Sequence, residues 1–131
     1  MTHLAMLPHI KLKGDSAVAT GYLLIESGKE TAVAKVSQTQ PLDRNDIEYV
    51  CQTAKAGEYL GNKLIYLEAG SGAELAVPLA MIQKAKATLS VPLIVGGGIR
   101  SKEAIENAFD AGADMVVIGT AFENDNSFFN V

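Results

Sequence analysis

The chain of 131 residues is poor in several features that mark whole classes of protein. It has one cysteine, Cys51, so it forms no internal disulfide, and a reducing cytoplasm is the expected compartment. It carries 11 basic against 15 acidic residues, and a net charge of −4 argues against general binding to nucleic acid or to membrane surfaces. No uncharged apolar run approaches the ~20 residues that span a bilayer. We therefore expect a cytoplasmic protein with no nucleic-acid partner.

The chain nevertheless has enough apolar sequence to bury a core. Hydrophobic residues make up 48% of it and charged residues 20%, a balance typical of globular proteins rather than of disordered chains. One domain over residues 1–131 is the expected organisation at this length. Cys51 falls among apolar residues at helical spacing, so we expect a buried thiol there and not a nucleophile.

Short apolar runs alternate with helix-like segments along the sequence. Four of these runs are predicted to be strands: 22–25, 64–67, 91–95 and 115–118. Residues 31–36 alternate apolar and polar side chains, which predicts either a short extension of the preceding strand or an edge strand. The expected helix boundaries consist of N-caps, a starting proline and glycine stops: Asp43 or Asn45, Gly61, Pro78, Ser101 and Gly112.

Apolar strands separated by helices predict a parallel sheet covered by those helices. A complete eight-stranded barrel takes ~250 residues, so a chain of this length holds roughly half of one. The predicted fold is therefore α/β, the parallel half of a TIM (β/α)8 barrel with about four βα units. Such a half exposes sheet edges and an inner apolar face. We expect another copy, another chain or a rearrangement into an open sheet to cover them.

Two glycine-rich turns follow successive predicted strands. Gly96, Gly97 and Gly98 end the strand before a helix, and Gly119 and Thr120 end the next strand. Backbone N–H groups without a nearby Cβ are suited to wrap a phosphate, and paired turns of this kind build phosphate sites in parallel barrels. Each turn alone is also compatible with tight helix–strand packing. The sequence lacks the Lys-Ser/Thr of a P-loop and the spacing of a dinucleotide fingerprint.

The segment from Tyr66 to Gly72 carries the candidate chemistry. Strand alternation predicts Tyr66 and Glu68 on one face, opposite Leu67, and Gly70-Ser71-Gly72 supplies a third loop with a hydroxyl. The alternative interpretation is a plain Gly-Ser turn, with Tyr66 in the core and Glu68 solvated. Arg100, just after the triple glycine, is expected either to pair with a phosphate or to lie at the surface.

Three motifs together resemble the geranylgeranylglyceryl phosphate synthase family, which includes the bacterial heptaprenylglyceryl phosphate synthases. They are Tyr66-Leu-Glu-Ala-Gly-Ser-Gly72, Val95-Gly-Gly-Gly-Ile-Arg-Ser101 and Ala111-Gly-Ala-Asp-Met-Val-Val-Ile-Gly-Thr120. The resemblance runs from about Thr20 to Glu123 and covers the second half of a TIM-barrel enzyme. Residues 1–19 match the family poorly.

The resemblance implies a prenyltransferase of ether lipid synthesis, which joins a polyprenyl group from a prenyl diphosphate to sn-glycerol 1-phosphate with Mg²⁺ on the diphosphate. It implies that Glu68 is the catalytic base and that Tyr66 lies beside the developing allylic cation. The implied glycerol phosphate site comprises Tyr66, Leu67, Glu68, Ala69, Gly70, Ser71, Gly72, Gly97, Gly98, Gly119 and Thr120.

The chain departs from the family at its beginning. The first-strand segment, with an aspartate and a lysine for Mg²⁺ and phosphate, is not reproduced, and Lys11 to Asp15 is at most a superficial echo. We therefore expect no metal ligand in this chain. We expect a fragment, a degenerate paralogue or a half-barrel that pairs with a copy of itself or with another half, and peripheral membrane contact through the lipid product.

Two other functions stay open beside the prenyltransferase. One is a phosphate-binding half-barrel without catalysis, kept as an assembly module, and the missing metal half favours it for this chain alone. The other is a phosphate-binding barrel isomerase or synthase of histidine, tryptophan or thiamine type. Glu68 in its Tyr-x-Glu-x-Gly-Ser-Gly setting favours the prenyltransferase over that third function.

Overall fold

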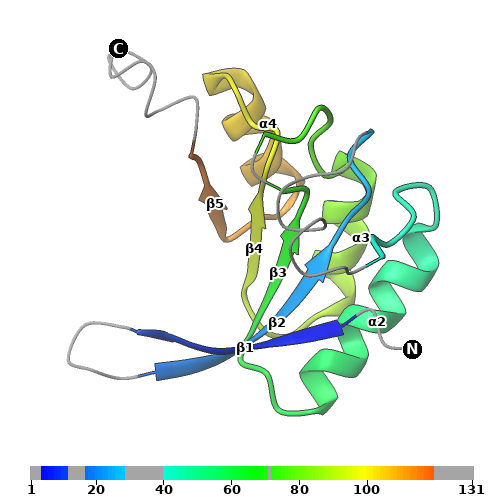
Figure 1. The fold of residues 1–131 in the computed structure, drawn as a ribbon, viewed down its shortest axis with the longest axis vertical. Coiled ribbons are helices and arrows are strands. Elements are labelled where there is room, and N and C mark those ends of the chain that lie inside the picture. Colours follow the sequence, from blue (N-terminus) through cyan, green and yellow to red (C-terminus); the bar gives the residue numbers. More distant parts are fainter. Residues whose placement is uncertain (1–3, 12–16, 29–39, 71, 120–131) are drawn as a thin grey trace.

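A computed structural model describes residues 4–11, 17–28, 40–70 and 72–119 of the chain. The elements follow one another as an antiparallel strand pair and then alternating helices and strands (Figure 1). Their bounds are β1 Leu4–Lys11, β2 Ala17–Leu24, α2 Ile47–Tyr59, β3 Leu64–Glu68, α3 Leu79–Thr88, β4 Leu93–Gly96, α4 Lys102–Ala111 and β5 Met115–Val117. The predicted short strand at residues 31–36 lies outside the described residues.

The strands form one sheet in the order β1-β2-β3-β4-β5. The pairs β2–β3, β3–β4 and β4–β5 are parallel, whereas β1 runs antiparallel to β2. In Figure 1, α2 and α3 lie side by side along the sheet and α4 lies beyond them near β4 and β5. Four parallel strands that alternate with helices confirm the predicted α/β fold, the parallel half of a TIM barrel. The antiparallel strand β1 was not predicted.

The predicted boundaries of β2, β4 and β5 were wrong. The first parallel strand was expected at 22–25, but β2 begins at Ala17, because its first residues pair with β1 rather than with β3. The next correction is at β4, expected at 91–95 and observed at Leu93–Gly96. Pro92 has no N–H to give to the ladder, although its carbonyl accepts a hydrogen bond from Ile65 N at 3.1 Å. The expected strand at 115–118 ends one residue earlier, at Val117.

The core lies between the sheet and the helices. Alternate strand residues face it, and they pack against apolar residues of α2 and α3. The strand members are Leu23, Ile65, Leu67, Leu93 and Val95, and the helical ones include Val50, Cys51, Ala54, Met81, Ile82 and Ala85. Cys51 is buried as predicted, and burial raises the pKa of its thiol.

Helix caps were predicted with one error. The carboxylate of Asp46, not of Asp43 or Asn45, caps α2, since Asp46 Oδ1 accepts a hydrogen bond from Tyr49 N at 3.1 Å. The side chain of Asp43 instead binds the backbone before the helix, where its Oδ1 accepts a hydrogen bond from Asn45 N at 2.8 Å. At α4 the prediction is confirmed, because Ser101 Oγ accepts from Ala104 N at 3.0 Å. Pro78, Gly61 and Gly112 also flank their helices as expected.

Charged side chains hold the edge of the sheet where the parallel strands begin. Glu58, at the end of α2, accepts hydrogen bonds from Lys55 Nζ at 2.7 Å and from the Ser90 backbone N at 2.7 Å. These contacts, the Lys55 side chain first, lower the pKa of Glu58 to about 2. Asp114 Oδ2 accepts from Leu93 N at 2.8 Å and from Lys86 Nζ at 2.7 Å. Carboxylates therefore fix the entries into β4 and β5.

None of the helices in the described part of the chain is long and apolar enough to cross a membrane.

Candidate functional site

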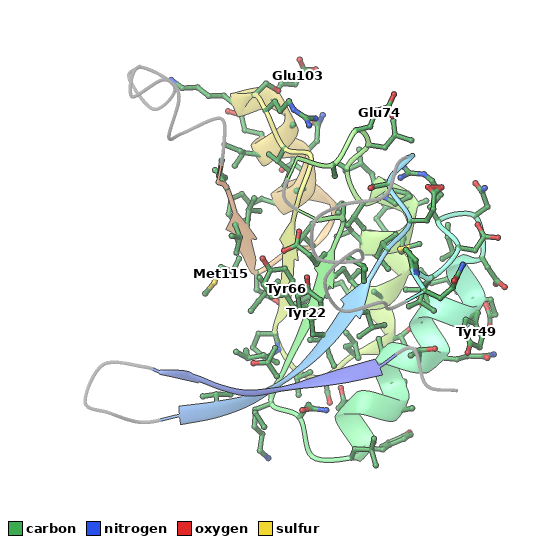
Figure 2. All side chains as sticks on the ribbon, in the orientation of Figure 1. Tyr22, Tyr49, Tyr66, Glu74, Glu103 and Met115 are labelled. Carbon is green, nitrogen blue, oxygen red and sulfur yellow. The ribbon has the colours of Figure 1, made fainter. Side chains whose placement is uncertain are left out.

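Two rows of residues cross the sheet on the face turned away from the helices. The in-register parallel pairs place them side by side from β2 to β5. The first row is Tyr22, Tyr66, Ile94 and Met115, and the second is Leu24, Glu68, Gly96 and Val117. Figure 2 shows Tyr22 and Tyr66 as neighbours on β2 and β3, with Met115 apart on β5. The second row lies at the carboxyl ends of the strands, next to the loops.

Tyr66 and Glu68 stand on this face as strand alternation predicts. Leu67 between them is fully buried in the core, while both of its neighbours are half-buried. Burial and then the Glu68 carboxylate raise the pKa of the Tyr66 phenol well above its usual range. The phenol is therefore a protonated hydrogen-bond donor at any physiological pH, beside a carboxylate that accepts.

Tyr22 is a site residue that the sequence interpretation missed. Its ring centroid lies 5.4 Å from that of Tyr66, with the ring planes tilted by 55°. Burial, and next the charge of Glu68, raise the pKa of Tyr22 as well. The sequence held the signal: Leu23 is apolar and faces the core, so Tyr22 must face the other side, in register with Tyr66.

Glu68 joins the face of the sheet turned away from the helices to the loop that follows β3. Its Oε1 accepts a hydrogen bond from Gly70 N at 2.8 Å. The loop then closes on itself, because Ala73 N donates to Gly70 O at 3.1 Å. Gly70 and Gly72 have φ of 100° and 75°, backbone that disfavours residues with a Cβ. Ser71, predicted to contribute a hydroxyl here, lies outside the described residues.

The glycine turn after β4 packs directly against that loop. A Cβ at Gly97 would lie 2.6 Å from Gly70 N and 2.6 Å from Glu68 Oε1, and one at Gly96 would lie 2.7 Å from the Tyr66 hydroxyl. Glycine is therefore required for the close approach of the two loops. Within the described residues, no hydrogen bond uses the N–H of Gly97 or Gly98. Among the described residues, these two N–H groups are therefore candidate donors to a ligand.

The other predicted binding residues differ in where the structure places them. Leu67 and Ala69 belong to the helix-facing core, so only their backbone is available to a ligand. Gly119 follows β5 at the same edge of the sheet, and no described atom would approach a Cβ there within 4 Å. Thr120 lies outside the described residues. The structure thus brings together Tyr66, Glu68, Gly70 and Gly97, while Gly119 has no such close neighbour among the described residues.

Arg100 contacts the loop after β3. Its Nη2 donates to Ala73 O and its Nη1 to Gly98 O, the latter at 3.4 Å. Of the two expectations for this residue, the surface position is confirmed, since Arg100 is exposed. Its guanidinium also binds backbone carbonyls of two loops.

The described residues do not by themselves fit a Mg²⁺ site. Across residues 4–11, 17–28, 40–70 and 72–119 no three His, Cys, Asp or Glu side chains lie close enough to hold a metal ion. What they do assemble is a carboxylate beside two phenols, next to unpaired backbone N–H groups. That set is able to accept a proton from a hydroxyl, present aromatic faces to a cation and donate hydrogen bonds to an anion.

Comparison with known proteins gives a consistent result. The sequence model of the PcrB family matches residues 1–130. A protein of Flavobacterium johnsoniae named geranylgeranylglyceryl phosphate synthase is 56% identical over 123 residues, which are 94% of this chain and 51% of that protein. One of the same name from Zunongwangia profunda is 49% identical over 122 residues, 93% of this chain and 52% of that protein. The chain spans about half the length of the curated relatives that it matches.

A solved structure shares the fold. The crystal structure of (S)-3-O-geranylgeranylglyceryl phosphate synthase from Thermoplasma acidophilum, in complex with substrate sn-glycerol-1-phosphate, matches with a TM-score of 0.77 at 36% identity. The match covers 84% of this chain and 44% of that chain. Both kinds of comparison agree with the resemblance found from the three motifs.

Proposed function

The chain belongs to the PcrB family, and on that premise we propose that it forms the glycerol phosphate-binding half of a prenyltransferase. The reaction transfers a polyprenyl group from a prenyl diphosphate to sn-glycerol 1-phosphate. One observation carries the proposal: the Glu68 carboxylate lies at the contact between the Gly70 loop and Gly97, beside Tyr66, at the carboxyl ends of parallel strands. Active sites of α/β barrels lie at that end.

In this proposal the phosphoryl group of the glycerol phosphate binds the backbone N–H groups of the glycine loops. Gly97 and Gly98 supply the donors described above, and Gly72, Ser71, Gly119 and Thr120 complete the set. Leu67, Ala69 and Gly70 contribute backbone to the wall of the same site. Binding the phosphate here brings the glycerol hydroxyls toward Glu68, and such positioning is a large part of catalysis in two-substrate reactions.

Glu68 then acts as the base. The C3 hydroxyl oxygen forms a bond to the allylic carbon, the carbon–oxygen bond to the diphosphate breaks with its electron pair on the diphosphate, and the hydroxyl proton passes to the carboxylate. Tyr66 lies beside the carbon that becomes positive, and the Tyr22 ring, 5.4 Å away, extends the aromatic surface. No metal ligand in this chain is part of the proposal, and the diphosphate site is assigned to a second half.

The second half is proposed from the open side of the sheet as well. Met115 and Val117 on β5 are 54% and 39% exposed, although both are apolar and face the same side as the site. A homo-oligomer or a separate half-barrel would cover them, and the lipid product would bring the assembly to a membrane surface. With its buried, unpaired Cys51, the protein is proposed to work in the cytoplasm.

Thermal unfolding with three ligands tests the proposal. A ligand that binds only the folded chain stabilises it, by about 2.7 kcal/mol at a hundred times its Kd. We expect sn-glycerol 1-phosphate to raise the unfolding temperature more than its sn-3 enantiomer, and more than inorganic phosphate. Equal weak effects of all three would support the non-catalytic phosphate-binding module instead. Turnover of both substrates by this chain alone at the rate of its relatives would refute the assignment of a missing half.

Glu68→Gln separates the two tasks of this residue. The amide oxygen still accepts from Gly70 N, so the loop keeps its anchor, while the base and the charge are lost. We expect weaker binding of sn-glycerol 1-phosphate and unchanged binding of inorganic phosphate. Glu74→Gln, at an exposed carboxylate on the same loop, is the matched control and should change neither. Loss of both ligands in Glu68→Gln would mean that Glu68 is structural only.

A further inference from the structure

Two arginines hold the loop between β3 and α3 from opposite sides. Arg44, just before α2, donates from Nη1 to Glu26 O at 3.1 Å and from Nη2 to Ala76 O at 3.0 Å. It therefore bridges the chain after β2 to the loop after β3. Both of these contacts are to backbone carbonyls and neither is to a carboxylate.

Arg100 makes the corresponding bridge on the other side. It donates to Gly98 O in the glycine turn after β4 and to Ala73 O in the loop after β3. The same two loops are also in direct contact, since a Cβ at Gly98 would lie 2.8 Å from Ala76 N. The loop after β3 is thus fastened at Ala73 from one neighbour and at Ala76 from the other.

We propose that Arg44 and Arg100 are positioning residues that hold the loop after β3 in its anion-binding conformation. The inference rests on the proposed function of that loop. Because each peptide unit is planar, fixing the carbonyls of Ala73 and Ala76 fixes two peptide planes of this loop and so restrains the backbone next to Gly72, whose N–H is one of the proposed donors. A loop held in place before the ligand arrives loses less entropy on binding, and the affinity is correspondingly higher.

Arginine is the residue that this task requires. Its planar fork donates to two carbonyls at once, whereas the ammonium of lysine is a point charge that lacks the fork. Exchange for lysine keeps the positive charge near the anion site and removes the bridge. Arg44→Lys and Arg100→Lys therefore separate positioning of the loop from simple attraction of an anion by charge.

The test measures binding of inorganic phosphate and of sn-glycerol 1-phosphate to the whole chain by calorimetry. We expect each lysine variant to bind both ligands about tenfold more weakly, the size of one net hydrogen bond. Their urea midpoints should stay close to that of the parent chain. Lys84→Gln, which removes a cation on α3 that pairs with Glu48, is the matched control and should leave both affinities unchanged.

A second measurement keeps the proposal open to refutation when a variant is unstable or the parent chain binds weakly. Amide hydrogen exchange at Gly72 and Ala73 should be faster in both lysine variants, with exchange in α2 unchanged. Unchanged affinity and unchanged exchange would overturn the inference and leave the proposed function intact. A parent chain that binds neither ligand, with faster loop exchange in the variants, would refute the proposed function and retain the positioning role. Loss of affinity in step with loss of stability would show a structural role only.

Discussion

The two ends of the parallel sheet differ in how their loops are held together. Where the strands end, loops meet backbone to backbone: Gly97 lies against Gly70 so closely that no Cβ fits between them. Where the strands begin, side chains make the contacts, as Glu58 accepts from Ser90 N and Asp114 accepts from Leu93 N. Glycines at the first end let backbone pack on backbone, although Glu68, Arg44 and Arg100 also bind the loops there. At the second end carboxylates bind the backbone N–H groups of the strand entries.

The difference has a physical meaning. A carboxylate that accepts a backbone N–H satisfies that donor and stabilises the fold. In the glycine turn, the N–H groups of Gly97 and Gly98 have no acceptor among the described residues, so this stabilisation is not made there and a ligand would be the acceptor in the proposed function. In α/β barrels generally, function lies at the carboxyl ends of strands and stability at the amino ends. This half-barrel shows how the division is made at the level of single amides.

The largest effect is expected from filling the contact between the loops. Gly97→Ala adds a Cβ that meets Glu68 Oε1 and Gly70 N at 2.6 Å, on a residue with φ of 89°. We expect the free energy of unfolding to fall by about 2–5 kcal/mol, from backbone strain and overpacking together, and phosphate binding to be lost. Urea unfolding and calorimetry measure the two effects.

The matched control for that change is Gly61→Ala. Gly61 has φ of 103° and open space where a Cβ would be, so it bears the strain without the clash. Its expected cost is about 1–2 kcal/mol. Equal losses in the two variants would show that the close contact of the loops contributes nothing.

The second largest effect is expected at the contact between the glycine turn and Tyr66. Gly96→Ala places a Cβ 2.7 Å from the Tyr66 hydroxyl, and we expect a loss of about 1–3 kcal/mol. Removing that hydroxyl with Tyr66→Phe in the same chain should recover part of the loss. Tyr22→Phe, at the neighbouring ring, should recover none. A double-mutant cycle from urea unfolding gives the coupling, and additivity of Gly96→Ala and Tyr66→Phe would contradict the contact.

At the end of the sheet where the strands begin, Glu58 predicts that the stability of the fold depends on pH. The folded-state pKa of Glu58 is lowered to about 2 from 4.5, so its contribution to stability is present above pH 4.5 and is lost as the pH falls toward 2. Glu58→Gln should therefore flatten the fall in stability over that window. Ser90→Ala removes one of the donors to Glu58, so its loss of stability over this pH window should be intermediate between those of the parent and Glu58→Gln. Urea midpoints at several pH values measure this, and parallel curves for Glu58→Gln and the parent would refute it.

The smallest effect is expected at the exposed pair of Asp114 and Lys86. Asp114→Asn keeps an acceptor for Leu93 N and loses the ion pair, whose side chains are 41% and 40% exposed. The expected loss is about 0–1 kcal/mol and should shrink as salt is added. Unfolding at low and high ionic strength is the measurement. A large, salt-independent loss would show that the strand entry depends on the charge itself.

Local patterns in the sequence predicted the parts of the fold that depend on near neighbours. Strand β3 and the opposed faces of Leu67 and Glu68 follow from a period of two, and the Ser101 cap follows from its side chain and position. The family also follows from local motifs, and it is confirmed by the PcrB match. The roles assigned to individual site residues remain predictions.

The parts that were missed depend on pairing at a distance. β1 contains Pro8, and its register with β2 shifts between Leu7 and Ile10, so its sequence does not read as a regular strand. The hydrogen bond from Arg44 to Ala76 joins residues 32 positions apart in the sequence, and it forms only when three loops are folded. Tyr22 was treated as part of a strand, because its contact with Tyr66 needs the register of two strands.

Strand β1 has a consequence for how the molecule can grow. Each strand has two sides for hydrogen bonding, and β2 uses both, one for β1 and one for β3. An incoming polypeptide on that flank must therefore either attach outside β1 or exchange places with it. β5 is the opposite edge of the sheet, and among the described residues no strand would have to be displaced there. A second chain that replaces β1 would therefore bind slowly, because β1 must first dissociate from β2. A chain that adds to β5 would bind faster.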